Sequence, residues 1–369
     1  MKEKKLKSFG SFIMACFSAV AFFGIGYLYQ YFVINIDNEL LTMCLYFLIV
    51  FCIYYFHVII HELGHLVFGL LTGYEFVSFR IGSFMIIKKE KMLLKKLSLA
   101  GTLGQCLMAP PSLKDKKIPY VLYNLGGSFF NLLVSIICLI IYAIIDELLI
   151  KLILFIAIII GINTFLTNAI PIKMMINNDG YNALSLYKNP KSIYYFWIQL
   201  KVNELLSKDV SLLDMDETWF KISNDDDLKD SMIVVVAVMN CNRLMYSGNF
   251  KQSKECIEHL LSVESGIVDL HRYLLICDLI YCKLILGEFD VDKLLTKEQL
   301  KFMKMMHNYI SVIRVEYAIA CLYDKNIEKS KLLKNKFEKV SLTYPYGNEL
   351  LMEKELIDLV DDKIKNVLK

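Results

Sequence analysis

Two histidines and a glutamate lie close together in a long apolar stretch of this 369-residue chain. They form the segment His-Glu-Leu-Gly-His at 61–65, within an apolar run from about Leu40 to Leu71. On a helix, His61 and His65 share one face, so their ring nitrogens can hold a Zn²⁺ ion while Glu62 takes a proton from its bound water. The segment therefore predicts the chemistry of a zinc-dependent hydrolase.

The apolar surroundings strengthen this interpretation. By chance alone, such a five-residue pattern is expected in roughly one chain of this length in a hundred. Each ionisable side chain in a lipid-spanning helix, however, costs at least about 2.5 kcal/mol. Three of them within two turns are retained only if something coordinates or uses them, so we expect a metal site.

A catalytic zinc ion has a third protein ligand and keeps its fourth position for water. Asp179 follows the last apolar stretch by about nine residues and returns to the side of the membrane on which the histidines lie, so we expect it to be that ligand. An Asp-Gly pair taken alone is more typical of a turn or a helix cap. The other candidates are less well placed, because Asp146 and Glu147 fall on the opposite side and Glu75 is expected to face the lipid headgroups.

His57 lies one helical turn before His61 on nearly the same stripe, although each step of four residues drifts by about 40° around the helix axis. It could be a further metal ligand or a substrate contact. A position that supports the metal ligands or lines a pore is favoured, because His57 lies farther from the water-accessible end of the helix.

Composition indicates a membrane protein, because 56% of the residues are hydrophobic against roughly 45–50% in soluble proteins. The net charge of +3, without a basic stripe interleaved with aromatic residues, argues against nucleic acid as a partner. The 10 cysteines contain no Cys-x-x-Cys pair, which is typical of reduced thiols in a cytosol-facing protein.

Hydropathy predicts four membrane spans, at about 9–32, 40–71, 120–145 and 149–170. The first is about 24 residues long and lacks an Ala-x-Ala cleavage site, so it is expected to be a retained span and not a signal peptide. Lysines gather before the first span and between the second and third. By the positive-inside rule, the chain is expected to be a multi-pass protein of the cell membrane with both termini cytoplasmic.

We therefore expect an all-α, multi-pass membrane fold of about four transmembrane helices with a short β-hairpin insertion, followed by a soluble α-helical, repeat-like domain. The predicted domains are 1–39, an N-terminal span and loop; 40–187, the metal-bearing core; and 188–369, the cytosolic helical part. The strand-like stretches Val77 to Phe84 and Leu97 to Met108 form the hairpin or small sheet. Its edge could hold an unwound substrate strand, or the segment could be a plain amphipathic linker.

The C-terminal part contains three similar segments, in which Phe250, Phe289 and Ile327 recur at intervals of about 39 and 38 residues. It resembles a degenerate tetratricopeptide array over about 230–368. That resemblance implies a surface for a peptide or protein partner, whereas a purely structural helical tail is the alternative.

Over about residues 40–185 the chain resembles the site-2 proteases, which are intramembrane zinc metalloproteases. The resemblance rests on the segment 61–65, on Gly-Ser-Phe-Phe-Asn at 127–131, and on Asn-Ala-Ile-Pro at 168–171 leading to Asn-Asp-Gly at 178–180. It implies that His61, His65 and Asp179 bind zinc, that Glu62 is the general base, and that Asn131 projects into the site near the substrate.

Three positions depart from the pattern of that family. Ser128 and Ala169 stand where prolines are usual, and Asn178 replaces the usual leucine before Asp-Gly. The ligand types are unaffected, but the geometry on the substrate side is put in doubt. The chain also contains no PDZ or cystathionine-synthase-like module, so the regulation seen in several branches of the family does not carry over.

The expected activity is hydrolysis of a peptide bond in or beside a transmembrane segment, with the lipid bilayer, a membrane-embedded peptide or protein substrate and a protein bound to the C-terminal part as partners. Two alternatives remain. One is a catalytically silent, membrane-anchored binding protein that acts through its helical C-terminal part, and the other is a membrane-tethered peptidase acting on soluble peptides. Signal-peptide remnants, a peptide pheromone or bacteriocin precursor, and a membrane-held transcription regulator are all compatible substrates.

Overall fold

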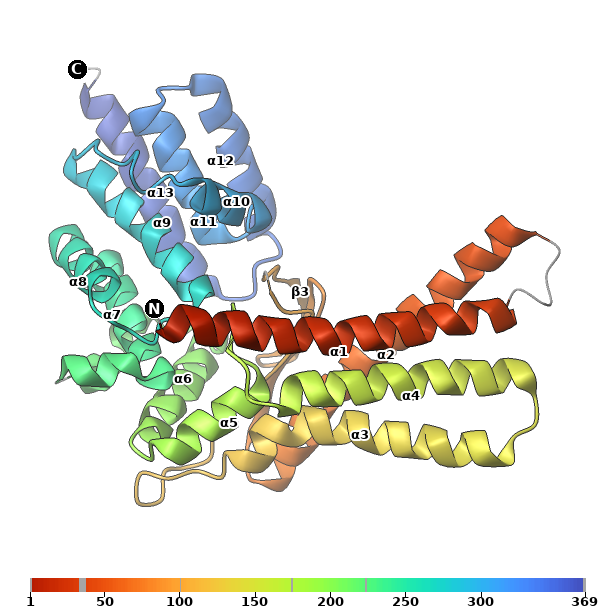
Figure 1. Ribbon diagram of the computed structural model, residues 1–369. Coiled ribbons are helices and arrows are strands. Elements are labelled where there is room, and N and C mark those ends of the chain that lie inside the picture. The colour runs from red at the N-terminus through yellow and green to blue at the C-terminus, as the bar shows by residue number, and fades with distance from the viewer. Residues whose placement is uncertain (1, 33–37, 100, 174, 223, 368–369) are drawn as a thin grey trace. The chain divides into compact units, whose positions relative to one another are not determined.

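The computed structural model describes residues 2–32, 38–99, 101–173, 175–222 and 224–367. The chain is mostly helical, with a small antiparallel sheet inserted after the second helix (Figure 1). The elements of its first half are α1 (Lys2–Phe32), α2 (Glu39–Leu71), β1 (Glu75–Ile81), β2 (Phe84–Lys88), β3 (Met92–Lys96), β4 (Gly104–Ala109), α3 (Val121–Ile144), α4 (Leu148–Ala169) and α5 (Asp179–Lys188). The second half contains α6 (Ser192–Ser207), the 3₁₀ turns η2 (Leu212–Asp214), η3 (Glu217–Phe220) and η4 (Asp225–Lys229), α7 (Ser231–Tyr246), α8 (Phe250–Ser262), α9 (Asp269–Leu286), α10 (Lys297–Met305), α11 (Ile310–Ala318), the π-helical turn η5 (Ile319–Tyr323), α12 (Ile327–Ser341) and α13 (Gly347–Val367).

The chain forms two compact units. The first comprises residues 1–75, 103–106 and 119–188, and the second comprises 76–102, 107–118 and 189–369. Most of the inserted sheet thus belongs to the second unit, whereas the sequence analysis assigned the whole insertion to the domain at 40–187.

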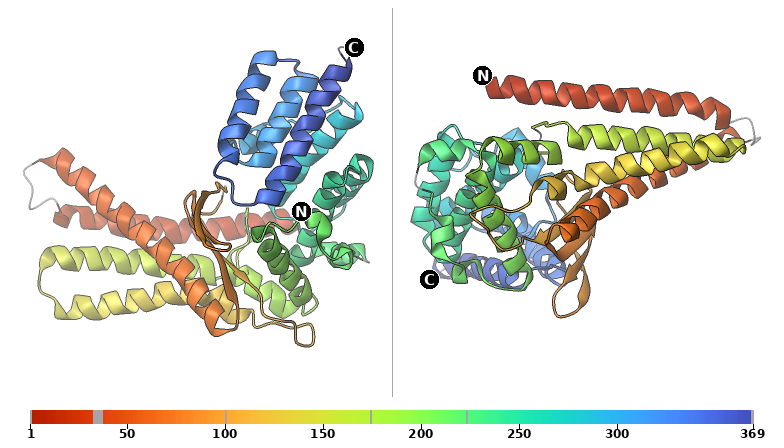
Figure 2. Two further views of the ribbon diagram at one scale, coloured as in Figure 1. Left: turned by 180° about the vertical axis from the view of Figure 1, so that it is seen from behind. Right: turned by 90° about the horizontal axis from the view of Figure 1, so that it is seen from below.

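Three helices of the first unit are long and apolar enough to cross a membrane: α2, α3 and α4. They correspond to three of the four predicted spans. The first predicted span lies within α1, several of whose side chains fall outside the described part of the structure, so that span stays a prediction. Helices α3 and α4 run side by side as a hairpin, and α2 packs against both of them (Figure 2).

Helix α2 carries the histidines near its C-terminal end. It begins after Asn38, whose side chain accepts a hydrogen bond from the Leu41 amide at 3.1 Å. Its 33 residues give a length of about 50 Å, which exceeds the roughly 30 Å hydrocarbon thickness of a bilayer. It ends before Gly73, which adopts a left-handed conformation with φ of 87°. His61 and His65 consequently lie toward one end of the span.

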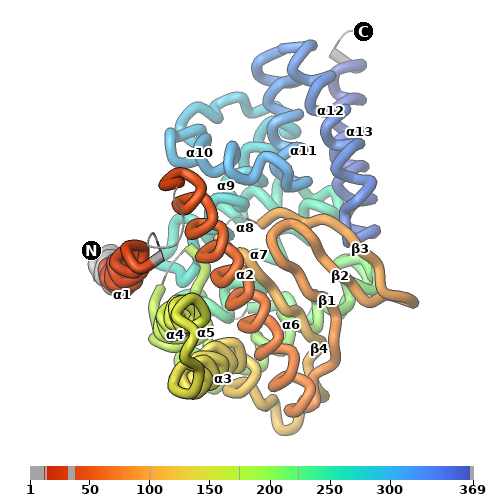
Figure 3. The backbone as a smooth tube through the Cα atoms, turned by 90° about the vertical axis from the view of Figure 1, so that its right-hand side faces the viewer, coloured from red at the N-terminus to blue at the C-terminus, as the bar shows by residue number. Residues whose placement is uncertain are grey.

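The insertion forms a four-stranded sheet in the order β3-β2-β1-β4, and these strands lie side by side in Figure 3. The pairs β1–β2 and β2–β3 are antiparallel, with Ile81 opposite Phe84 and Lys88 opposite Met92. The predicted short hairpin is therefore part of a larger sheet. The predicted stretches, Val77 to Phe84 and Leu97 to Met108, missed nearly all of β2 and all of β3. The residues of β3 are exposed or half-buried and include two lysines, so they give no clear strand signal.

The second unit is built from helix pairs. Gly248 and Gly287 both have a left-handed backbone, with φ of 79° and 82°; the first lies in the turn between α7 and α8, and the second ends α9. Helix α8 packs against α7 and α9, and α11 packs against α9, α12 and α13. The repeated sequence segments thus fall at helix ends, as a helix-pair repeat requires. Membership of the tetratricopeptide family stays a prediction.

Candidate metal centre

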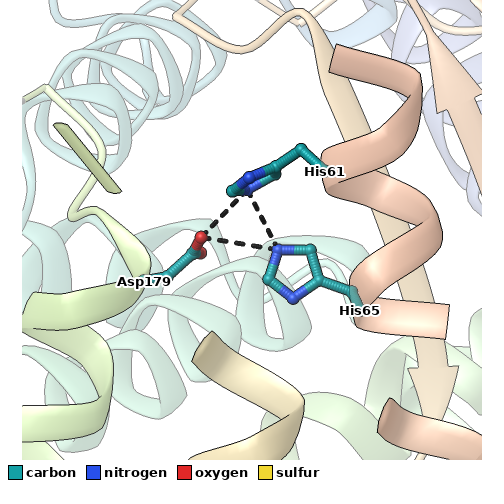
Figure 4. A group of neighbouring side chains, drawn as sticks. All are labelled: His61, His65 and Asp179. Atoms are coloured by element: carbon teal, nitrogen blue, oxygen red, sulfur yellow. Dashed lines mark hydrogen bonds and ion pairs between the residues drawn. The ribbon is translucent and has the colours of Figure 1, made fainter. Parts of the chain in front are cut away.

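Three side chains from two helices converge on one point. The Nε2 atoms of His61 and His65 lie 3.2 Å apart, and the Asp179 Oδ2 atom lies 3.0 Å from the first and 3.4 Å from the second (Figure 4). The two histidines project from α2, and Asp179 begins α5. The structure therefore brings together all three of the metal ligands expected from the sequence.

The triangle has the dimensions of one face of a zinc coordination sphere. With bonds of about 2.0–2.1 Å and tetrahedral angles, two ligand atoms on one zinc ion lie about 3.3 Å apart. The three observed separations lie within 0.3 Å of this value. Within the described ranges, this is the one group of three His, Cys, Asp or Glu side chains close enough to hold an ion. The residues thus fit a metal ion with two nitrogen ligands and one oxygen ligand.

The backbone of α3 leaves room beside the ligands. A Cβ atom on Gly127 would lie 2.7 Å from the Nε2 atoms of both His61 and His65. Gly64 and Gly126 likewise bring the backbones of α2 and α3 into direct contact, because a Cβ atom on Gly64 would lie 2.3 Å from the Gly126 carbonyl oxygen. The three glycines therefore allow α3 to approach the histidine face of α2 closely.

A backbone carbonyl group orients His65. The Nδ1 atom of this ring lies 2.7 Å from the carbonyl oxygen of Tyr123, and an oxygen of this kind can only accept. Nδ1 therefore carries a proton, and in the singly protonated ring the lone pair of Nε2 points into the cluster. A ring held in this tautomer is ready to coordinate a metal ion.

A chain of side-chain contacts orients His61. Its Nδ1 atom lies 3.1 Å from the Asn131 amide nitrogen, and the Asn131 amide oxygen lies 2.9 Å from Nδ1 of His57. His57 therefore contacts Asn131 and is not a member of the ligand triangle. Asn131 is fully buried, with both ends of its amide engaged by histidines. The role of Asn131 toward a substrate stays a prediction.

The residue before Asp179 holds it in place. The Asn178 side chain accepts hydrogen bonds from the backbone amides of Ile172 (3.1 Å) and Tyr181 (2.9 Å), and it donates to the carbonyl groups of Thr167 (2.8 Å) and Ile170 (2.6 Å). The bonds to Thr167, Ile170 and Ile172 tie the start of α5 to the end of α4 and the loop after it, and the bond from Tyr181 caps α5. A leucine at this position could form none of them.

Gly180 brings α5 equally close to α4. A Cβ atom at this position would lie 2.1 Å from the carbonyl oxygen of Ala169. Burial by itself would raise the pKa of the Asp179 carboxyl group, but positive charge on the imidazoles of His65 and His61 outweighs this effect and lowers it well below its usual range. Asp179 is therefore an ionised acceptor at neutral pH.

Glu62 is buried next to the ligands in sequence, with 7% of its surface exposed. The backbone at the start of β4 approaches it, because a Cβ atom on Gly104 would lie 2.3 Å from its Oε1 atom. Burial and the nearby Glu62 charge raise the pKa of the Cys106 thiol, so this thiol stays protonated. Glu62 is thus a buried carboxylate in a confined position, and its role as a base stays a prediction.

Comparisons with protein-family models, curated proteins and solved structures find no match to this chain. The acidic alternatives to Asp179 lie elsewhere: Glu75 begins β1, and Asp146 and Glu147 lie in the turn between α3 and α4.

Sequence reasoning missed the Tyr123 carbonyl group, the Asn178 side chain and Gly104. The first is a backbone atom and leaves no signal in the sequence. Asn178 was visible only as a departure from the site-2 protease pattern.

Proposed function

We propose that this chain is an intramembrane zinc metalloprotease that hydrolyses a peptide bond in or next to a transmembrane segment or a membrane-bound peptide precursor. The proposal is based on one observation above the others, namely that a carboxylate from α5 meets two imidazoles of α2 at the edge lengths of a zinc coordination sphere. The resemblance to the site-2 proteases supports it.

The proposed chemistry divides between the metal and Glu62. A bound Zn²⁺ ion would supply a Lewis acid and lower the pKa of a bound water molecule toward neutrality. His61, His65 and Asp179 would hold it. Glu62 accepts the proton of the attacking water, and its burial next to the β4 backbone keeps competing water away from the carboxylate.

A substrate helix must unwind before it can react, because all of its carbonyl groups are hydrogen-bonded internally. Strand β4 stands at the end of the strand order and begins at Gly104, beside Glu62. Main-chain pairing along this strand would hold an unwound segment next to the base. This arrangement favours a substrate that is presented as an extended strand.

The proposal places the protein in the cell membrane with its N- and C-termini in the cytoplasm, as the lysine distribution indicates. The helix pairs of the second unit would then lie in the cytoplasm. Their arrangement suits a surface for a peptide or protein partner, in keeping with the resemblance to tetratricopeptide arrays.

The decisive experiment compares the wild-type chain with Glu62→Gln. Both are expressed in the same host, membrane fractions are collected, and new peptide N-termini are identified by chemical labelling and mass spectrometry. We expect termini within or beside transmembrane segments to appear only with the wild-type chain. The zinc content of both purified proteins should be about one ion per chain, because the amide substitution removes the base and leaves the ligands.

Three outcomes separate the alternatives. Equal processing by Glu62→Gln would show that Glu62 is not the base. New termini confined to soluble peptides would indicate a membrane-tethered peptidase. Zinc binding without any difference in termini would favour the silent binding protein that acts through its helical part.

A further inference from the structure

The hydrogen-bond chain that ends at His57 has no role in the chemistry described so far. It runs from His61 through Asn131 to His57, with contacts of 3.1 and 2.9 Å, and both Asn131 and His57 are fully buried. A buried imidazole in a membrane helix is costly unless it performs a function. The positions of the protons along these hydrogen bonds indicate a role for His57.

Without a metal ion, the donors and acceptors of these hydrogen bonds can all be paired when the bonds run in one direction. The Asn131 amide nitrogen donates to Nδ1 of His61, so the proton of that ring is on Nε2, which lies 3.0 Å from the Asp179 carboxylate. The Asn131 oxygen accepts from Nδ1 of His57. In this state His57 is the donor at its Nδ1 atom.

A metal ion reverses the direction. To coordinate through Nε2, His61 must carry its proton on Nδ1, which then becomes a donor. Asn131 can accept from it only with its oxygen, which a 180° turn of the amide group brings into place. The Asn131 nitrogen then donates to Nδ1 of His57, which must accept. Each imidazole keeps one proton throughout, so no net charge is created.

His57 suits this reversal because one of its atoms can serve either as donor or as acceptor. Its Nε2 atom makes no well-formed hydrogen bond among the described residues, and the ring also lies near the Ala157 backbone carbonyl group of α4, so placing the proton on Nε2 breaks no existing bond. The ring is also held in position by α4, since a Cβ atom on Gly161 would lie 2.5 Å from its Cε1 atom. A fixed ring with a free choice of tautomer can follow the Asn131 amide.

We propose that His57 is a positioning residue that acts through Asn131 to keep His61 oriented, and to set its proton, in both the metal-free and the metal-bound state. The proposal rests on the proposed function, since it requires that the cluster bind a metal ion. It predicts that loss of His57 weakens metal binding without removing a ligand.

The test measures the affinity of the full-length, detergent-purified protein for Zn²⁺ by competition with a chromophoric chelator. We expect His57→Leu and His57→Phe, which carry no ring nitrogen, to weaken binding by about 10- to 100-fold. His57→Asn should stay within about threefold of the wild type, because its amide can also donate or accept. Thr42→Val is the matched control, since Thr42 is a buried polar residue of the same helix that bonds only within its own turn.

A double-mutant cycle tests whether His57 acts through Asn131. If it does, adding His57→Leu to Asn131→Leu should weaken Zn²⁺ binding no further than Asn131→Leu alone. Substitution with Co²⁺ gives a second readout, because a reoriented His61 changes the visible absorption bands of the metal. The melting temperature of each metal-free variant shows whether it is folded. If His57→Leu unfolds the protein, the Zn²⁺ affinities of His57→Phe and His57→Asn are compared instead.

The proposal is overturned if His57→Leu or His57→Phe binds Zn²⁺ within twofold of the wild type, or if the effects at the two positions simply add. Failure of the wild-type chain to bind one zinc ion per molecule would instead remove the proposed function, so the two failures are distinguishable.

Discussion

At the scale of single residues, the metal centre depends on an absent side chain as much as on the ligands. Gly127 faces the two imidazoles so closely that a methyl group would overlap their Nε2 atoms at 2.7 Å. Real Cβ atoms do not approach other atoms so closely, so a larger residue must push the rings apart or rotate them. The position thus links the packing of α3 to the ligand geometry.

We therefore predict that Gly127→Ala weakens Zn²⁺ binding by at least about 10-fold, because a displacement of the rings misplaces two of the three ligand atoms. The measurement is a competition titration on the purified protein. Gly26→Ala is the matched control, since it makes the same change in a helix of the same unit where a Cβ atom meets nothing within 4 Å. Wild-type affinity in Gly127→Ala would contradict the assigned ligand geometry.

At the scale of elements, a buried ionic group joins three helices of the second unit. Arg314 of α11 is fully buried; its Nη1 atom lies 3.1 Å from Glu353 of α13, and its Nη2 atom contacts Asp278 of α9. Its guanidinium group also lies over the Tyr281 ring, 4.6 Å from the centroid. Burial raises the pKa of both carboxyl groups, and the arginine charge opposes this effect. Arg314 thus keeps two buried carboxylates compatible with the packed helices.

We predict that Arg314→Met destabilises the protein by about 3–5 kcal/mol, because it leaves uncompensated buried carboxylates. The pKa values of both acids are raised in the folded state, so lowering the pH protonates them and removes their charge. The loss of stability should therefore be larger at pH 8 than at pH 5. Denaturant titrations of the wild type and the variant at the two pH values measure this loss of stability.

The control for this variant is Lys365→Met, which breaks the exposed ion pair with Asp362 and should change stability by less than about 1 kcal/mol. Equal losses at both pH values would argue against ionised carboxylates in the group around Arg314.

At the scale of the whole molecule, the expected topology places the turn between α3 and α4 outside the cell and the segment around Lys116 in the cytoplasm. The Asp146 side chain in that turn is fully exposed, and Lys116 is exposed as well. Both positions are therefore accessible to a water-soluble reagent from their own side of the membrane. The same topology predicts which side of the membrane the candidate metal site faces.

We predict that a membrane-impermeant maleimide labels Asp146→Cys in intact cells and labels Lys116→Cys only after the membrane is permeabilised. The reason is the excess of lysines on the cytoplasmic side. The unmodified chain, with its 10 native cysteines, provides the background for both measurements. The reverse labelling pattern would invert the topology and place the site at the outer face.

The candidate ligands on α2 and the apolar helices could be predicted from the sequence, because they depend on local periodicity; the role of Glu62 as a base stays a prediction. A spacing of four residues puts His61 and His65 on one helix face, and a run of about 20 apolar residues suffices to cross a bilayer. Asp179 could also be predicted as a candidate ligand, because the number of spans decides on which side of the membrane a loop emerges. Such inferences require no knowledge of which side chains touch.

Only the tertiary structure decided how the ligands are held. The Tyr123 carbonyl group beside His65, the hydrogen bonds of Asn178 to Thr167, Ile170 and Ile172, and the approach of Gly104 to Glu62 all join segments whose contact no local pattern encodes. The pairing of the four strands could not be predicted from the sequence pattern for the same reason. Hydrogen bonds and close backbone contacts between distant segments depend on ångström-scale placement, and that placement arises from the packing of the whole unit.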